Sequence, residues 1–176
     1  GLYYWEKGKP KKSNPDLSKL FKQKVMYTTK IGNQSRDFIN NVDDFGEPDW
    51  ENIDPRSYPQ TMPHGTIYKS SPFAPIITTR GCPYSCTYCS APITAGKKMR
   101  YRDPIKIVDE MENLINNYGV KEVQIEDDNF TLKRRHAVAV CEEIIRRKIK
   151  LDWSLPNGVR IDKLDPELLK LMKKSG

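Results

Sequence analysis

Three cysteines within eight residues are the part of this sequence best suited to chemistry. Cys82, Cys86 and Cys89 follow one another at spacings of four and three, which places three thiolates in one tight loop. Gly81 stands directly before them and allows the chain to turn sharply. Closely spaced thiolates are soft ligands that suit zinc or an iron–sulfur cluster. The spacing therefore predicts a metal-binding loop.

The choice of metal depends on whether the chain offers a fourth ligand, because structural zinc is almost always held by four protein ligands. The other candidate ligands stand far from the loop in sequence: His64, His136 and Cys141. Cys141 falls on the apolar face of an expected helix, where a small core residue is typical. A three-thiolate iron–sulfur site with one open iron position therefore fits the residues better than zinc.

The elements that must position this loop follow from the pattern after Pro72. Short β-prone runs predict three strands, at Ile76–Thr79, Val120–Ile125 and Leu151–Leu155. Helices are expected after each strand region, because apolar residues recur there at helical spacing.

Local signals mark the ends of these helices. Asp103-Pro104 and Asp165-Pro166 each combine an N-capping residue with proline in the first turn. Thr131 is expected to cap the middle helix, and Gly119 to end the first one. The basic residues of Arg146–Lys148 are expected to be helix-end charges.

Strand–helix alternation, repeated three times, indicates the α/β class, with a parallel sheet, right-handed crossovers and helices on one face. In such folds the loops after the carboxyl ends of the strands carry the chemistry. Three polar segments stand in those positions: Cys82–Cys89, Glu126–Asn129 and Asn157–Arg160. We expect them to meet at one edge of the sheet.

The cysteine spacing, the strand before it and Tyr88 beside the last cysteine resemble the radical S-adenosylmethionine (radical SAM) superfamily. The resemblance covers roughly residues 72–176. It implies that Cys82, Cys86 and Cys89 bind a 4Fe–4S cluster whose fourth iron is chelated by S-adenosylmethionine. It also implies reductive cleavage of S-adenosylmethionine to a 5′-deoxyadenosyl radical, with Tyr88 against the adenine.

Further site residues follow from the same resemblance. Asp127 or Asp128 stands where family members contact the amino group of S-adenosylmethionine, and the sequence leaves open which of the two does so. Arg160 matches a position that often pairs with the methionine carboxylate. The acidic motif Asp127-Asp128-Asn129-Phe130 is similar to that of the branch whose members often carry a cobalamin-binding domain before the barrel. Cobalamin held by an upstream domain and radical methylation or rearrangement of an unactivated carbon are therefore expected.

The resemblance also predicts the domain organisation. Residues 71–176 are expected to form the first half, three βα units, of a partial (βα)6 barrel. Residues 1–70 are expected to be a linker that forms the end of an upstream cobalamin-type region. A short hairpin is expected near its start, with a strand at Leu2–Trp5 and a turn at Gly8. In Asn41–Pro59 the aromatic residues Phe45, Trp50 and Tyr58 are expected to tack an irregular segment onto the domain. The chain is thus expected to be a fragment of a longer protein, inactive alone.

Thirty Lys and Arg against twenty-three Asp and Glu give a formal charge of +7. The mean hydropathy of −0.72 and the short apolar runs predict no membrane span. The basic run of Lys97, Lys98, Arg100 and Arg102 fits an RNA phosphate patch, a face toward an anionic substrate or cofactor, or a solvated surface. Clustered thiols without a secretory signal indicate a reducing cytoplasm.

Two alternative functions compete with the leading one. A methylthiotransferase-like radical SAM enzyme acting on RNA or protein would be favoured by the positive charge. A zinc-stabilised nucleic-acid-binding module would use the same cysteines without catalysis. For the enzyme, the expected partners are a small-molecule or peptide substrate and an electron donor such as flavodoxin or ferredoxin, with nucleic acid disfavoured.

Overall fold

A computed structural model describes residues 3–6, 9–12, 37–58 and 68–176. The chain divides into two compact units, Gly1–Asp37 and Phe38–Gly176. In the first unit, strands β1 (Tyr3–Glu6) and β2 (Lys9–Lys12) pair antiparallel. The short hairpin expected near the N-terminus is thereby confirmed.

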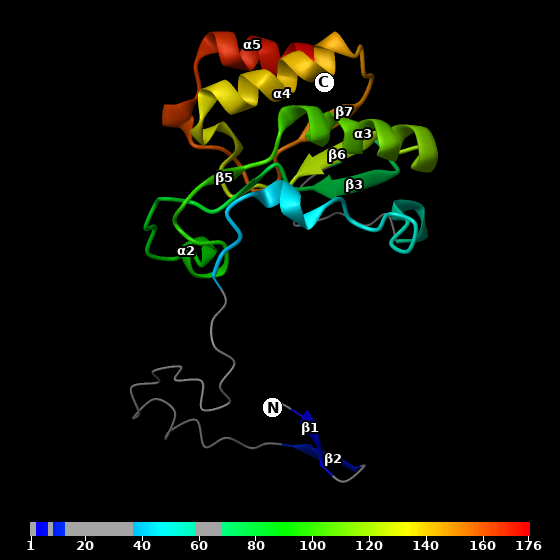
Figure 1. Ribbon diagram of the computed structural model, residues 1–176, viewed down its shortest axis with the longest axis vertical. Coiled ribbons are helices and arrows are strands. Elements are labelled where there is room, and N and C mark those ends of the chain that lie inside the picture. The colour runs from blue at the N-terminus through cyan, green and yellow to red at the C-terminus, as the bar shows by residue number, and fades with distance from the viewer. Residues whose placement is uncertain (1–2, 7–8, 13–36, 59–67) are drawn as a thin grey trace. The chain divides into compact units, whose positions relative to one another are not determined.

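A three-stranded parallel sheet forms the centre of the second unit (Figure 1). Its strands are β3 (Phe73–Ile76), β6 (Glu122–Ile125) and β7 (Asp152–Ser154), in the spatial order β3-β6-β7. In the register, Phe73 lies beside Glu122, and Glu122 lies beside Asp152. The parallel α/β sheet predicted from the alternation of elements is confirmed.

The first predicted strand, Ile76–Thr79, is wrong in its bounds. Strand β3 ends at Ile76, and a separate two-residue strand, β4 (Thr79–Arg80), follows it. Strand β4 pairs antiparallel with β5 (Arg100–Tyr101) instead of joining the main sheet. The chain therefore leaves the sheet before the cysteines are reached.

Helices α3 (Pro104–Tyr118) and α5 (Pro166–Ser175) begin where their caps predict. Asp103 accepts a hydrogen bond from the backbone N–H of Ile105 at 2.8 Å, and Asp165 accepts one from Leu168 at 2.8 Å. Such caps satisfy amide donors that have no partner within the helix. Gly119 ends α3 with a left-handed φ of 64°, as expected.

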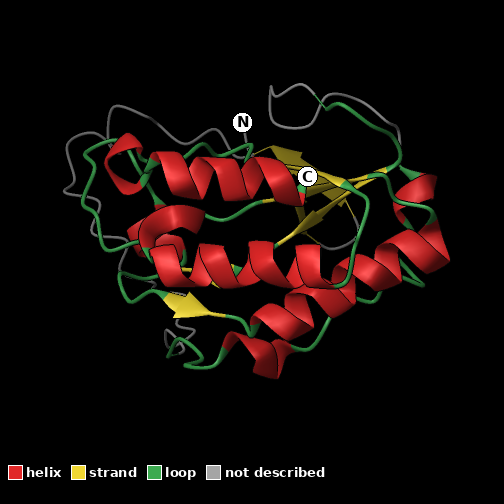
Figure 2. Cartoon of the chain, turned by 90° about the horizontal axis from the view of Figure 1, so that it is seen from above, coloured by secondary structure: helices red, strands yellow, loops and turns green. Residues whose placement is uncertain are grey.

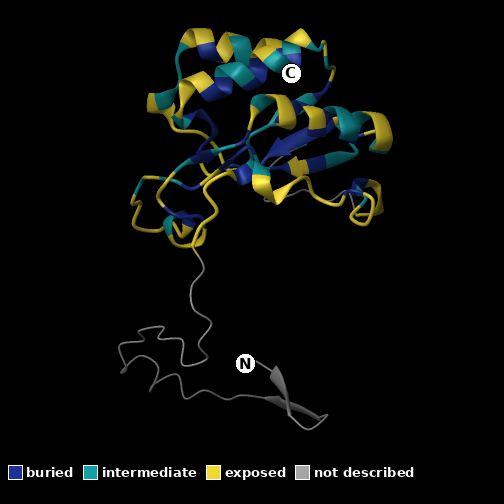
Figure 3. Cartoon of the chain, viewed as in Figure 1, coloured by how far each residue is buried: buried dark blue, intermediate teal, exposed yellow. Residues whose placement is uncertain are grey.

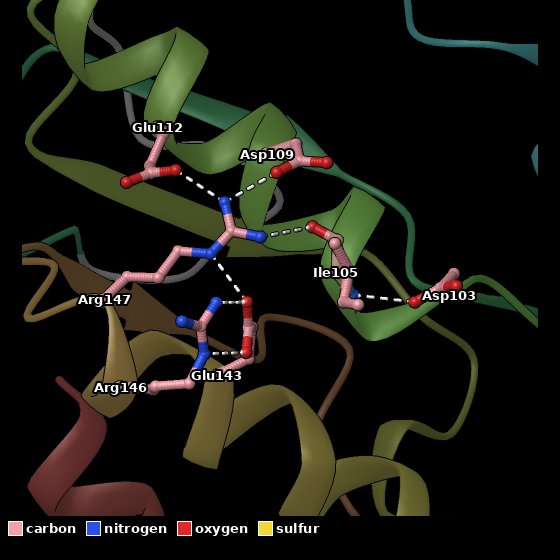
Figure 4. A network of polar contacts seen from close by, with 7 residues as sticks. All are labelled: Asp103, Ile105, Asp109, Glu112, Glu143, Arg146 and Arg147. Atoms are coloured by element: carbon pink, nitrogen blue, oxygen red, sulfur yellow. Dashed lines mark hydrogen bonds and ion pairs between the residues drawn. The ribbon is translucent and has the colours of Figure 1, made fainter.

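Helix α4 (Arg134–Arg146) begins later than Thr131 predicts. Thr131 lies in a buried 3-10 turn, η4 (Phe130–Leu132), and the residue before α4, Lys133, makes no capping bond through its side chain. At the other end, Arg147 binds Asp109 and Glu112 of α3 at 2.6 Å each (Figure 4). This helix-end charge therefore fastens α4 to α3.

Helices α3, α4 and α5 cover one face of the sheet, as predicted (Figures 1 and 2). Figure 3 colours the buried residues of the sheet and of the helices dark blue. These residues form one core that includes Ile76, Met111, Leu114, Val123, Ile125, Val140, Ile144 and Leu168. Full burial of one such side chain contributes about 1.5–3 kcal/mol. Across the described ranges, no helix has the length and apolar character needed to cross a membrane.

The segment before β3 carries two 3-10 turns, η1 (Val42–Phe45) and η2 (Pro55–Ser57), and is held to the core by Trp50. The Trp50 side chain is buried, and its Nε1 donates to Glu110 Oε1 of α3 at 3.2 Å. Phe45 and Tyr58 are 59% and 55% exposed. Of the three aromatic residues expected to anchor this segment, Trp50 alone is buried.

Candidate functional site

Residues 81–99, here called the cysteine loop, connect β4 to β5 and contain all three clustered cysteines. The base of the loop is closed, because the backbone N–H of Cys82 donates to the carbonyl of Gly96 at 3.0 Å. Gly81 has a φ of +99°, and a Cβ there would lie 2.5 Å from the Lys98 carbonyl oxygen. Only glycine fits this corner without a backbone shift.

The three cysteines of the loop are free thiols. Cys82 is half-buried, whereas Cys86 and Cys89 are exposed. The sulfur of Cys89 accepts a hydrogen bond from the backbone N–H of Ala91 at 3.4 Å, in the first turn of the short helix α2 (Ala91–Thr94). This contact ties the third cysteine to the start of α2.

In the described part of the chain, no three His, Cys, Asp or Glu side chains are grouped closely enough to hold a metal ion. The structure thus places the three thiols on one loop without bringing their sulfurs together. His136 and Cys141 are both buried in α4, and His64 lies outside the described residues. The burial of Cys141 agrees with its predicted place in the core.

Asp127, two residues after the end of β6, is bound to the chain that leads into the cysteine loop. Its side chain is 2% exposed, and its Oδ1 accepts the backbone N–H groups of Thr78 and Thr79 at 2.7 and 2.9 Å. Its Oδ2 accepts the Thr78 hydroxyl. Burial raises the pKa of the carboxyl, and the hydrogen bonds oppose that rise. Asp127 therefore ties the carboxyl end of β6 to the start of β4.

Asp128, the neighbouring acidic residue, is exposed. Glu126, which precedes Asp127, accepts a hydrogen bond from Asn157 Nδ2, in the segment after β7, at 3.2 Å. The segments after β6 and β7 therefore meet at the carboxyl edge of the sheet, as predicted. Of the two aspartates, Asp128 is the one whose carboxylate faces solvent.

Arg160, after β7, lies against the cysteine loop. Its guanidinium carbon stands 3.9 Å from the centre of the Tyr84 ring, and its Nε donates to Asp162 Oδ1 at 2.9 Å. The hydrogen bond to Asp162 raises the pKa of Arg160, so the guanidinium stays charged. The third polar segment therefore reaches the cysteines through Tyr84, a residue that the sequence did not single out.

Tyr88, between the second and third cysteines, is 92% exposed. Its ring therefore makes little contact with the described part of the chain. An aromatic side chain displayed in this way next to Cys89 is free to stack on a flat ligand.

The basic run that follows the cysteines is not a continuous surface patch. Arg100 is buried and donates to the carbonyl oxygens of Ile39 and Ala95. Arg102 is buried too, with its Nη1 2.6 Å from Glu110 Oε2. Both guanidinium groups are thus engaged within the fold. Of this run, Lys97 and Lys98 are exposed and could contact an RNA phosphate.

A cleft of about 690 Å³ opens beside β3, with mostly apolar walls. Trp50, Phe73 and Pro75 line it, and it extends to Arg80 and Glu126 at the carboxyl edge of the sheet. Because Arg80 precedes the cysteine loop and Glu126 precedes Asp127, one end of the cleft lies at the predicted site.

Comparison with known proteins supports the family resemblance described above. The sequence profile of the radical SAM superfamily matches residues 76–176 of the chain. The anaerobic magnesium-protoporphyrin IX monomethyl ester cyclase of Cereibacter sphaeroides is 35% identical over 142 residues, which are 78% of this chain and 22% of that protein. The cytidylyl-2-hydroxyethylphosphonate methyltransferase of Streptomyces wedmorensis is 33% identical over 73% of this chain and 24% of its own length.

Among solved structures, the chain is similar to TsrM from Kitasatospora setae, a radical S-adenosylmethionine methyltransferase with cobalamin and a [4Fe-4S] cluster bound. The TM-score is 0.55 and the identity 28%, over 59% of this chain and 21% of TsrM. The chain therefore spans between 21% and 24% of the length of these three proteins.

Proposed function

The chain belongs to the radical SAM superfamily, and we propose that it forms the part of a radical SAM enzyme that binds a 4Fe–4S cluster and S-adenosylmethionine. The observation that carries this proposal is the cysteine loop, which is closed at its base and flanked by the segments after β6 and β7. These three features come from distant parts of the sequence and meet at the carboxyl edge of one sheet.

The chemistry of the donor set fits the cluster. Cys82, Cys86 and Cys89 are free, two of them are exposed, and the Cys89 sulfur already accepts a backbone N–H. Hydrogen bonds to the sulfurs are among the features that tune such clusters. Because the base of the loop is fixed at Cys82, gathering the sulfurs requires movement within the loop alone. When bound, the cluster would supply one electron for the reductive cleavage of S-adenosylmethionine.

Three side chains are assigned to S-adenosylmethionine. Asp128 presents an exposed carboxylate for the amino group, and Arg160 presents a charged guanidinium for the methionine carboxylate. Tyr88 presents an exposed ring for the adenine. Asp127 has both carboxylate oxygens engaged by Thr78 and Thr79, so we assign it to holding the edge rather than to direct contact.

The relatives support a narrower assignment within the superfamily. Two of the proteins compared are methyltransferases, and TsrM binds cobalamin. We therefore infer cobalamin-associated radical methylation or rearrangement of an unactivated carbon, with cobalamin contacts outside this chain. The sheet β3-β6-β7 would be the first half of a partial (βα)6 barrel. A reduced protein such as flavodoxin or ferredoxin would supply the electron.

Anaerobic reconstitution with iron and sulfide tests the proposal. The wild-type chain is expected to take up iron and sulfide together, and single Cys→Ala changes at Cys82, Cys86 or Cys89 are expected to abolish stable uptake. Cys141→Ala is the matched control, because this thiol is buried in α4 away from the loop, and it should load normally. Stoichiometric zinc binding without iron uptake would instead support a zinc module and overturn the proposal.

A further inference from the structure

We propose that Tyr84 is a positioning residue that orients the guanidinium of Arg160 for the carboxylate of S-adenosylmethionine. This inference rests on the proposed function, since it assumes that Arg160 meets that carboxylate. Tyr84 stands between the first two cysteines, whereas Arg160 lies after β7 on the other side of the sheet order. Their contact is therefore a tertiary one.

The ring of Tyr84 covers one face of the Arg160 guanidinium. The guanidinium carbon of Arg160 lies 3.9 Å from the Tyr84 ring centre, well within the range of a cation–π contact. A planar cation over an aromatic ring has its plane restricted by the ring. Tyr84 thus limits the rotation of a side chain that is 42% exposed and otherwise long and flexible.

Asp162 fixes one edge of the same group. It accepts a hydrogen bond from Nε of Arg160 at 2.9 Å. Within the described residues, Nη1 and Nη2 of Arg160 donate to no protein acceptor. One face and one edge of the guanidinium are therefore occupied, and the edge that carries Nη1 and Nη2 remains. That edge presents two parallel N–H donors, which is the geometry that a carboxylate accepts in a bidentate pair.

Tyr84 lies within the cysteine loop, between Cys82 and Cys86. Because the ring belongs to the loop that carries the thiols, it links the place where the cluster would bind to the residue that would hold the cofactor carboxylate. A loop residue without a ring would leave Arg160 attached through Asp162 alone. Preorganising a group that binds a ligand improves affinity, because less freedom is lost on binding.

The test compares ring-retaining and ring-removing variants in the reconstituted protein. Binding of S-adenosylmethionine is measured by anaerobic titration calorimetry, with iron content measured on the same samples. Tyr84→Phe keeps the ring and should bind like the wild type. Tyr84→Leu removes the ring and should bind about three- to ten-fold more weakly, with unchanged iron content. In an Arg160→Ala background, Tyr84→Leu should cause no further loss.

A measurement without any cofactor examines the stack itself. The Nε–H resonance of Arg160 should carry a ring-current shift in the apo protein, which persists in Tyr84→Phe and disappears in Tyr84→Leu. Absence of this shift in the wild type would refute the positioning role.

The outcomes separate this inference from the proposed function. Wild-type affinity in Tyr84→Leu, together with weakened binding in Arg160→Ala, would overturn the role of Tyr84 and leave the proposed function intact. Loss of iron in Tyr84→Leu would show that the ring serves the cluster instead, which also overturns it. Failure of the wild type to take up iron would count against the proposed function, while the apo resonance would still report on the stack.

Discussion

Removing the carboxylate of Asp127 is expected to destabilise the domain, because this group closes a gap between two strands. In the wild type it accepts the backbone N–H groups of Thr78 and Thr79 and the hydroxyl of Thr78. All of these groups are buried. Asp127→Ala would leave two backbone donors without an acceptor, in a place that water does not reach.

The magnitude follows from those two donors. A buried donor left unsatisfied costs about 1–3 kcal/mol, so the pair costs about 2–6 kcal/mol. The variant also loses the cost of burying a carboxylate, which is the cost that raises the pKa of Asp127. We therefore expect a net loss of about 3 kcal/mol in the free energy of unfolding. Asp127→Asn keeps an oxygen for both backbone donors and should lose about 1 kcal/mol.

Urea denaturation followed by tryptophan fluorescence measures these losses. With a slope of roughly 2 kcal/mol/M, a loss of about 3 kcal/mol lowers the midpoint by about 1.5 M. Asp128→Ala is the matched control, because Asp128 is adjacent and exposed, and its midpoint should stay close to that of the wild type. If Asp127→Ala and Asp128→Ala have the same midpoint, the carboxylate does not join β6 to β4 as argued.

Three other features give further predictions. Burial lowers the pKa of His136 to about 4, below its usual 6.5. Between pH 7 and pH 5 the imidazole is therefore protonated in the unfolded chain but not in the folded one, and the free energy of unfolding should fall by about 2 kcal/mol. Urea midpoints measured at both pH values should show a smaller fall in His136→Phe. Gly81→Ala should lower the melting temperature by several degrees more than Gly119→Ala, because both have positive φ but only Gly81 would clash with backbone. Arg147→Ala should lower the free energy of unfolding in urea by about 1–2 kcal/mol, and Arg146→Ala should lower it less, because Arg147 bridges α3 and α4 whereas Arg146 binds Glu143 within α4.

The parts of the fold that could be predicted from the sequence are those set by neighbouring residues. Asp103 and Asp165 cap their helices through bonds two and three residues away, so the signal and its partner are both local. Thr131 carries the same kind of signal, yet it is buried in a 3-10 turn, because the chain there packs into the core before α4 begins.

The parts of the site that could not be predicted depend on distant partners. Asp127 is buried and Asp128 exposed because the Asp127 carboxylate binds Thr78, forty-nine residues away. The burial of Arg100 depends on the carbonyl of Ile39, sixty-one residues away. The contact between Tyr84 and Arg160 joins the loop after β4 to the segment after β7. Periodicity and spacing along the chain carry no information about such pairs.

The closed base of the cysteine loop also bears on how a cofactor could be loaded and lost. Because the β4–β5 pairing and the bond between Cys82 and Gly96 hold both ends of the loop, its middle can open without breaking β3, β6 or β7. Such local opening requires far less free energy than global unfolding. If the loop binds the proposed cluster, the cluster could therefore be inserted after folding, and a damaged one could be replaced while the domain stays folded. Such local opening would be seen as faster amide hydrogen exchange in residues 82–95 than in the strands β3, β6 and β7.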